Sequence, residues 1–335
     1  MRALIVTNMY PSPDRPALGS FVRDQVEALR RTGQAEIAVF AFAPGGALAY
    51  LRGAAALRRS LGRGAQRFDI VHAHFGLTEW PALAVPARAH LVTLHGTDVS
   101  HPRSRALTLA GGRLMDLVAA VSEPLAHEVP RWATRRPVAV LPCGVDLHRF
   151  RPIDRAQARR VLGLDPETPC LLFPADPARA EKRFDRAREV AGEIPLLTLR
   201  DVEPAAVALW VNAANAVLVP SEREGFGLAT LEALACDVPV LATPVGIAPE
   251  ALHGVTGALC AEFDRDTWSA ALAPHLATAD PRISGRSHAE PFSSDAMALR
   301  VLDTWRELLG EPAGAAAVPE AAAVPEAAAV PEAAA

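Results

Sequence analysis

Short apolar segments alternate along the chain with segments of helical periodicity. In the first half, six segments are almost continuously apolar, as are strands of a parallel sheet that is buried on both faces. These expected strands cover residues 3–8, 36–42, 69–74, 90–95, 116–122 and 138–142. Between the first two, apolar side chains in 20–33 recur on one face of a helix that Gly33 would end. This pattern predicts a doubly wound α/β domain.

The same alternation restarts after a turn-rich segment at 142–152. The expected strands of this second series are 170–175, 195–199, 216–221, 238–243 and 256–260. The sequence therefore predicts two Rossmann-like domains, at residues 1–148 and 149–310, with a last helix over 295–310. Residues 311–335 repeat Val-Pro-Glu between alanine triplets and have nothing large to bury, so we expect a disordered tail.

The charge is divided unevenly between the two halves. Residues 1–150 carry a net charge of +7 and residues 151–335 a net charge of −11, which together give −4. An acidic chain is not expected to bind nucleic acid, but its basic half is expected to face something anionic. The four cysteines contain no Cys-x-x-Cys pair, and no apolar segment is long enough for a signal peptide or a membrane span. We therefore expect a cytoplasmic protein.

The stretch EGFGLATLE, residues 224–232, carries the most specific chemical signal. It follows an expected strand, and ligands of open α/β sheets bind beyond the carboxyl ends of the strands. A helix beginning near Gly227 would direct backbone N–H groups at an anion. Eight helical residues span about 12 Å, so Glu224 and Glu232 could hold the two ends of a sugar nucleotide whose phosphates lie between them. A capped helix with two solvated glutamates is the alternative.

Residues 221–250, SEREGFGLATLEALACDVPVLATPVGIAPE, resemble the donor-site signature of family 4 glycosyltransferases, which are retaining enzymes of the GT-B fold. The segments FDIVHAHFG, TLHGTDV, AAVSEPL and LPCGVDLHRFRP resemble further landmarks of that family, closest to bacterial members in cell-wall and surface polysaccharide synthesis. The resemblance implies transfer of a sugar from a nucleotide-sugar donor to a saccharide or lipid-linked acceptor, without a metal or other cofactor. The first domain would bind the acceptor and the second the donor.

The resemblance also implies roles for single residues. Glu224 would hold the donor sugar, Glu232 the ribose, and Lys182, the only lysine, the phosphates. His95 matches an active-site histidine, so we expect a catalytic group of His95, Lys182 and Glu224, with Asp98 in contact with the acceptor. The expected donor-binding residues are Gly19, Arg179, Lys182, Glu224, Gly225, Phe226, Gly227, Leu228 and Glu232. A lone histidine or lysine can also be purely structural, and we expect this of His72 and His74.

Two departures from the family pattern leave alternatives open. Asp176 stands where the family has an arginine, six residues before the lysine, and Arg179 is the nearest substitute. One strand–helix unit is also missing between 195–199 and 216–221. A non-catalytic nucleotide-sugar-binding module is therefore one alternative. A sugar-nucleotide epimerase, which shares the fold and the donor type, is the other.

The segment 48–68 explains part of the basic charge of the first half. It contains five arginines and no acidic residue, and Leu48, Leu51, Ala55 and Leu61 could form one apolar helix face. An ordinary packed helix with solvated arginines is one interpretation. The other is peripheral contact with an anionic membrane at its inner face, where lipid-linked acceptors reside.

Overall fold

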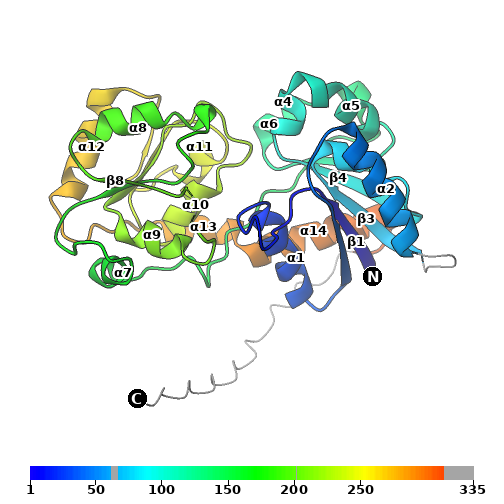
Figure 1. The fold of residues 1–335 in the computed structure, drawn as a ribbon, viewed down its shortest axis with the longest axis horizontal. Coiled ribbons are helices and arrows are strands. Elements are labelled where there is room, and N and C mark those ends of the chain that lie inside the picture. Colours follow the sequence, from blue (N-terminus) through cyan, green and yellow to red (C-terminus); the bar gives the residue numbers. More distant parts are fainter. Residues whose placement is uncertain (62–66, 201, 313–335) are drawn as a thin grey trace, which may run out of the picture.

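The computed structural model describes residues 1–61, 67–200 and 202–312, and it has two α/β domains side by side (Figure 1). The first sheet has six strands in the order β2-β1-β3-β4-β5-β6, and the second has five in the order β11-β10-β9-β7-β8. In each domain the first strand therefore pairs with the second on one side and with the third on the other. The predicted pair of doubly wound domains is confirmed. The predicted tail from residue 313 onward lies outside the described residues.

Each predicted strand coincides with an observed one. The first sheet contains β1 (Arg2–Thr7), β2 (Glu36–Ala41), β3 (Phe68–His74), β4 (Ala87–Leu94), β5 (Leu117–Ala120) and β6 (Ala139–Val140). The second contains β7 (Leu171–Phe173), β8 (Leu196–Thr198), β9 (Ala216–Val219), β10 (Val240–Ala242) and β11 (Leu259–Cys260). All these strand pairs are parallel, so the carboxyl ends of each sheet meet at one edge. The strand order reverses between β1 and β3 and between β7 and β9, and these are the places where ligands bind in such sheets.

Helices cover the faces of the two sheets. Those of the first domain are α1 (Ser20–Arg31), α2 (Ala47–Leu61), α3 (Glu79–Ala82), α4 (Thr97–Ser100), α5 (Pro102–Gly112) and α6 (Glu123–His127). Those that follow are α7 (Arg155–Val161), α8 (Phe184–Ala191), α9 (Val207–Ala213), α10 (Leu228–Ala235), α11 (Ala248–Ala251), α12 (Arg265–Leu276), α13 (Arg286–Ala289) and α14 (Ser294–Leu309). Within the described ranges, none of the helices is long and apolar enough to cross a bilayer.

The last helix, α14, returns to the first domain (Figure 1). Its buried residues Met297, Val301 and Trp305 belong to the same apolar core as Ile5 of β1 and Leu29 of α1. The helix begins within one residue of the predicted position, because Ser293 caps its amino terminus through the Ala296 N–H. The sequence-based division places this helix in the second domain, but its packing assigns it to the first. Sequence periodicity shows that a helix has an apolar face, but not which sheet that face meets.

We expect burial of Trp305 on this returning helix to contribute strongly to the stability of the first domain. Its side chain is fully buried, and its ring meets the edge of His72 at a centroid distance of 5.8 Å. We expect Trp305→Ala to lower the free energy of unfolding by about 3–5 kcal/mol, because the substitution leaves a large cavity. Urea denaturation measures this loss. Trp132→Ala, at a tryptophan that is 66% exposed, is the control and should change stability by less than about 0.5 kcal/mol.

Candidate active site

The carboxyl edges of the two sheets touch at a glycine. Ser122 Oγ, after β5 of the first domain, donates a 3.0 Å hydrogen bond to the carbonyl oxygen of Gly225 in the second domain. A Cβ atom on Gly225 would lie only 2.0 Å from the carbonyl oxygen of His95, which follows β4. Only glycine therefore fits at position 225 in this arrangement. The contact brings the loop after β9 directly against the end of β4.

Lys182 and Glu224 meet at the point in the second sheet where the strand order reverses. Lys182 Nζ lies 2.7 Å from Glu224 Oε1 and 2.6 Å from Oε2. Ser221 Oγ donates a further 2.8 Å hydrogen bond to Glu224 Oε1. The two loops are also joined through their backbones, because the Glu222 N–H donates to the Glu181 carbonyl at 2.9 Å. The structure thus brings two of the three predicted catalytic residues together.

The helix α10 begins where the sequence predicts. Gly227 has a φ of +97°, a left-handed conformation that glycine adopts without strain, and it has no side chain to cap the helix. The first N–H groups of α10, beginning at Leu228, are therefore available to an anion. Phe226 is buried under this turn, and its carbonyl accepts a 2.7 Å hydrogen bond from the Ile247 N–H. Phe226 therefore supports the turn by packing.

Glu232 lies on the second turn of α10. It is near a charged pair formed by Asp24 of α1 and Arg149 of the segment between the two domains. Arg149 and Asp24 form this pair, with Nη2 and Oδ2 2.5 Å apart. The pKa of Glu232 is raised to about 7, because burial raises it more than Arg149 lowers it, and Asp24 makes a smaller contribution that also raises it. A pocket of about 380 Å³ lies beside Arg149, lined by residues of both domains that include Pro11 and Pro204. The predicted ribose-binding carboxylate thus lies close to an interdomain hollow.

The raised pKa of Glu232 predicts how stability depends on pH. The folded protein favours the protonated carboxyl, so the contribution of Glu232 to stability is fully present below about pH 4.5 and is lost as the pH rises through about 7. We expect Glu232→Gln to raise the melting temperature at pH 8 and to change it little at pH 4.5. Glu189→Gln, at an exposed position of α8, should show no such difference between the two pH values. Equal shifts at both pH values for Glu232→Gln would contradict this prediction.

His95 lies at the end of β4 and packs against Phe21 of α1 at a ring-centroid distance of 4.8 Å. Burial lowers its pKa to about 3, so its imidazole is neutral at physiological pH. Asp98 is fully buried, and its carboxylate accepts hydrogen bonds from the N–H groups of His95, Gly96 and Gly76 at 2.9, 2.8 and 3.2 Å. The expected contact of Asp98 with the acceptor does not fit this geometry, since the carboxylate is enclosed and already bonded. Asp98 instead holds the turn that carries His95.

The other predicted phosphate contacts lie around these loops. Gly19 precedes α1 with a φ of +66°, and a Cβ there would lie 2.2 Å from the Met9 carbonyl oxygen. Arg179 is half-exposed and bonds Glu181 at 2.7 Å, so the structure does not bring it to Lys182 and Glu224. Asp176 accepts a 2.9 Å hydrogen bond from the Ala178 N–H and closes the turn. Donor binding by Gly19 and Arg179 stays a prediction.

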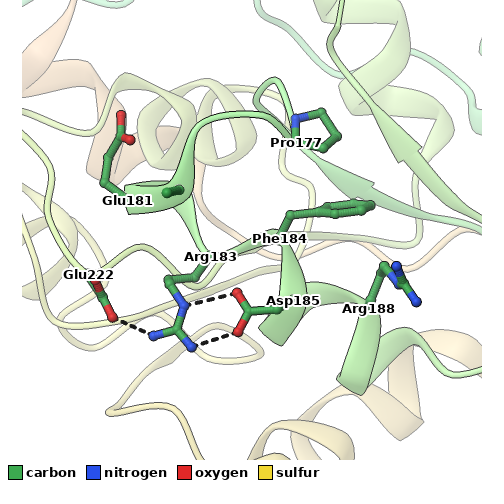
Figure 2. Close-up of a pocket in the computed structure, with 8 residues that line it drawn as sticks. Pro177, Glu181, Arg183, Phe184, Asp185, Arg188 and Glu222 are labelled. Carbon is green, nitrogen blue, oxygen red and sulfur yellow. Dashed lines mark hydrogen bonds and ion pairs between the residues drawn. The ribbon is translucent and has the colours of Figure 1, made fainter.

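A pocket of about 750 Å³ lies beside the turn that carries Lys182, and Glu181 and Arg183 are among the residues that line it (Figure 2). Arg183, with a φ of +55°, points along its wall and pairs with Asp185 at 2.6 Å and with Glu222 at 2.5 Å. These two partners belong to α8 and to the loop that carries Glu224. Arg183 therefore ties together the two segments on which Lys182 and Glu224 stand.

Gln25 and His74 are the residues at this site that sequence reasoning missed. We expected His74 to be structural, but its Nδ1 lies 3.1 Å from Nε2 of His95. Gln25 Nε2 lies 3.2 Å from Nε2 of the same His74 ring. The one signal in the sequence is that the predicted strands 69–74 and 90–95 both end in histidine. The observed β3 ends at His74, and His95 directly follows its neighbour β4.

Two family models match the chain. One, described as Glycosyltransferase Family 4, matches residues 5–149, and the other, described as Glycosyl transferases group 1, matches residues 174–277. The chain is 31% identical over 325 residues to the D-inositol 3-phosphate glycosyltransferase of Segniliparus rotundus, with 79% of this chain and 71% of the relative covered. A relative of the same name from Actinosynnema mirum is also 31% identical, with 68% and 70% covered.

Solved structures agree with this fold. Sucrose-phosphate synthase from Thermosynechococcus elongatus superimposes with a TM-score of 0.69 at 19% identity, covering 92% of this chain and 100% of that chain. Anabaena HepE in complex with UDP-glucose superimposes with a TM-score of 0.67 at 15% identity, covering 91% and 99%. These similarities confirm the predicted GT-B fold. The family matches and the relatives show that the chain belongs to glycosyltransferase family 4 and is an enzyme of that class.

Proposed function

We propose that this glycosyltransferase transfers a sugar from a nucleotide-sugar donor, held by the second domain, to an acceptor held by the first, with retention of anomeric configuration. The observation that carries the proposal is the contact of Lys182 with Glu224 beside the start of α10. This group faces the first domain where Gly225 touches His95. The solved relative that binds UDP-glucose supports a donor of the nucleotide-sugar type.

We propose that Lys182 binds the donor phosphate and, through Glu224, helps to fix the donor sugar. Its ammonium has three N–H donors, and the two oxygens of Glu224 occupy two of them. The third is left for a phosphate oxygen. Glu224, fixed by Lys182 and Ser221, would accept hydrogen bonds from hydroxyls of the donor sugar. The pair thus fixes the sugar next to the phosphate that leaves it.

In the proposed reaction the bond from the anomeric carbon to the diphosphate oxygen breaks, and its electron pair stays on the diphosphate. The acceptor oxygen bonds to the anomeric carbon on the same face, and its proton passes to the leaving phosphate oxygen. Lys182 and the N–H groups of α10 stabilise the negative charge that develops on the diphosphate. We propose that these groups do so without a metal ion, so transfer should continue in excess EDTA.

We infer that the acceptor is an anionic compound with a free hydroxyl. The first half carries a net charge of +7, and the relatives are named for D-inositol 3-phosphate. A saccharide or lipid-linked acceptor of cell-wall or surface polysaccharide synthesis is the class that the sequence resemblance favours. Both groups of acceptors should therefore be tested.

The test incubates the protein with nucleotide sugars and each acceptor, and follows products by mass spectrometry and anomeric configuration by NMR. The proposal expects a glycosylated acceptor with the configuration of the donor. An inverted product would contradict retention. An isomerised sugar nucleotide without acceptor would indicate an epimerase, and binding without any product would indicate a non-catalytic module.

We also propose that the enzyme is cytoplasmic and touches the inner face of the membrane through α2. Leu48 and Leu51 are 55% and 68% exposed, although they lie on its predicted apolar face, and Arg52 beside them is exposed too. Exposed leucines beside arginines suit an anionic lipid surface. At low salt, we expect sedimentation with vesicles that contain phosphatidylserine but not with neutral vesicles. A Leu48→Ser, Leu51→Ser variant should sediment less, and equal recovery of both proteins would contradict the contact.

A further inference from the structure

A series of three hydrogen-bonded side chains leads from α1 to His95, at the contact between the two domains. Gln25 of α1 contacts His74 at the end of β3, with the two Nε2 atoms 3.2 Å apart. His74 Nδ1 then lies 3.1 Å from His95 Nε2. The two imidazole rings have centroids 5.3 Å apart and planes 26° apart, which suits an end-to-end hydrogen bond between their ring nitrogens. Gln25 and His74 are buried, so water does not compete for these bonds.

The position of each proton along this series follows from the first donor. With the Gln25 amide oriented as in this structure, its nitrogen faces His74 Nε2 and can only donate, so His74 Nε2 accepts. A neutral imidazole that accepts at Nε2 carries its proton at Nδ1, and that proton is directed at His95. His95 Nε2 must therefore accept in turn. The proton of His95 is left on Nδ1.

The other ring nitrogen of His95, Nδ1, is not used by this series of hydrogen bonds. Nδ1 of His95 has no hydrogen-bond partner among the residues that the structure describes, and solvent can reach it. The same histidine contacts the second domain through its carbonyl oxygen, at the position that excludes a side chain on Gly225. The ring is held from the side by Phe21, which stands four residues before Gln25 on α1.

We propose that Gln25 and His74 are positioning residues, which hold His95 as the Nδ1–H tautomer so that it donates a hydrogen bond to an oxygen of the bound sugar or acceptor. In this role His95 orients a ligand and does not remove a proton from the acceptor. The proton of the acceptor then goes to the leaving phosphate. The inference rests on the proposed function only for the identity of the ligand.

The surroundings of the three residues support a neutral donor. Among the described residues, the carboxylate that bonds to the His95 segment is that of Asp98, and it binds backbone N–H groups rather than the imidazole. Burial lowers the pKa of both His74 and His95, so neither ring gains a second proton at neutral pH. His72 stacks on His74 with ring centroids 4.4 Å apart, but its Nε2 bonds to Thr93 Oγ1 at 2.8 Å. It is therefore not part of the hydrogen-bonded series that ends at His95.

The test reads the tautomers by NMR in protein labelled with ¹⁵N-histidine. We expect the wild type to carry the His95 proton on Nδ1 alone. Two variants break the series, Gln25→Met, which keeps the length of the side chain, and His74→Phe, which keeps the ring stack. In both we expect His95 to populate the Nε2–H form and kcat to fall about tenfold, the effect of one hydrogen bond. His72→Phe is the matched control, and it should keep the tautomer and kcat within about twofold.

A His95 proton on Nε2 in the wild type would overturn the proposal, whatever the activity. An unchanged tautomer in Gln25→Met would overturn it equally, and this milder variant decides the matter if His74→Phe fails to fold. Because the spectra need no substrate, they test the tautomer even if the proposed transfer reaction is not observed. A wrong function and a wrong tautomer therefore give different results.

Discussion

Glu224→Ala is expected to lower the rate of sugar transfer by about 10³-fold while the protein stays folded. The carboxylate is the partner of both Lys182 and Ser221, so its removal frees two side chains and takes away the proposed acceptor for the sugar hydroxyls. Losing one preorganised electrostatic contact in an active site costs about 10²–10³-fold in rate. The loss of order around Lys182 adds to this. Steady-state kinetics with saturating acceptor measures the effect, and circular dichroism monitors the fold.

Glu222→Ala is the matched control, two residues earlier in the same loop. The carboxylate of Glu222 is exposed and pairs with Arg183 (Figure 2). Exposed ion pairs contribute little to stability, so we expect transfer to fall less than about fivefold. Similar losses in the two variants would mean that the loop, and not the carboxylate of Glu224, supports transfer.

Lys182→Ala is expected to lower kcat by about 10²–10³-fold, because the leaving diphosphate loses its one nearby ammonium group. The substitution also leaves the carboxylate of Glu224 partly buried without its cation. Lys182→Arg should recover part of the rate, since the charge is retained while the compact three-donor geometry is lost. Pre-steady-state measurements that separate donor binding from transfer locate the loss in the chemical step.

Arg188→Ala supplies the control for charge alone. Arg188 is an exposed cation on the next helix, α8, and lines the pocket drawn in Figure 2. It should leave kcat within about twofold of wild type. Arg179→Ala separately tests whether a second cation reaches the phosphates when a donor is bound. Loss of kcat in Arg188→Ala as large as in Lys182→Ala would contradict a specific role for Lys182.

The strands could be predicted from the sequence because their apolar runs are short and nearly continuous. Segments such as 69–74 and 216–221 have no alternation, which is typical of strands that helices cover on both faces. The partner of α14 could not be predicted in this way. Its apolar residues show that one face is buried, but packing against β1 and α1 depends on the chain crossing back between domains near Val145 and Ser293.

The contact of Lys182 with Glu224 could be anticipated because each residue follows a strand in the same sheet, and the family resemblance singles out both. The roles of Asp98 and His74 could not. An aspartate three residues after a histidine reads equally well as a ligand contact or as a cap for backbone N–H groups. The hydrogen bond between His74 and His95 depends on β3 and β4 being neighbours in the sheet. The hydrophobic pattern of a segment does not determine which strands are neighbours.

The most direct measurement is a thermal-shift titration with UDP-, GDP-, ADP- and dTDP-sugars on the wild type and on Glu232→Ala. A donor at 100 times its dissociation constant should add about 2.7 kcal/mol to the stability of the folded state. The proposed site predicts a clear rise in melting temperature with one nucleotide type, and loss of that rise in Glu232→Ala. No rise with any of the four, or an equal rise in the variant, would contradict a donor site built on Lys182, Glu224 and Glu232.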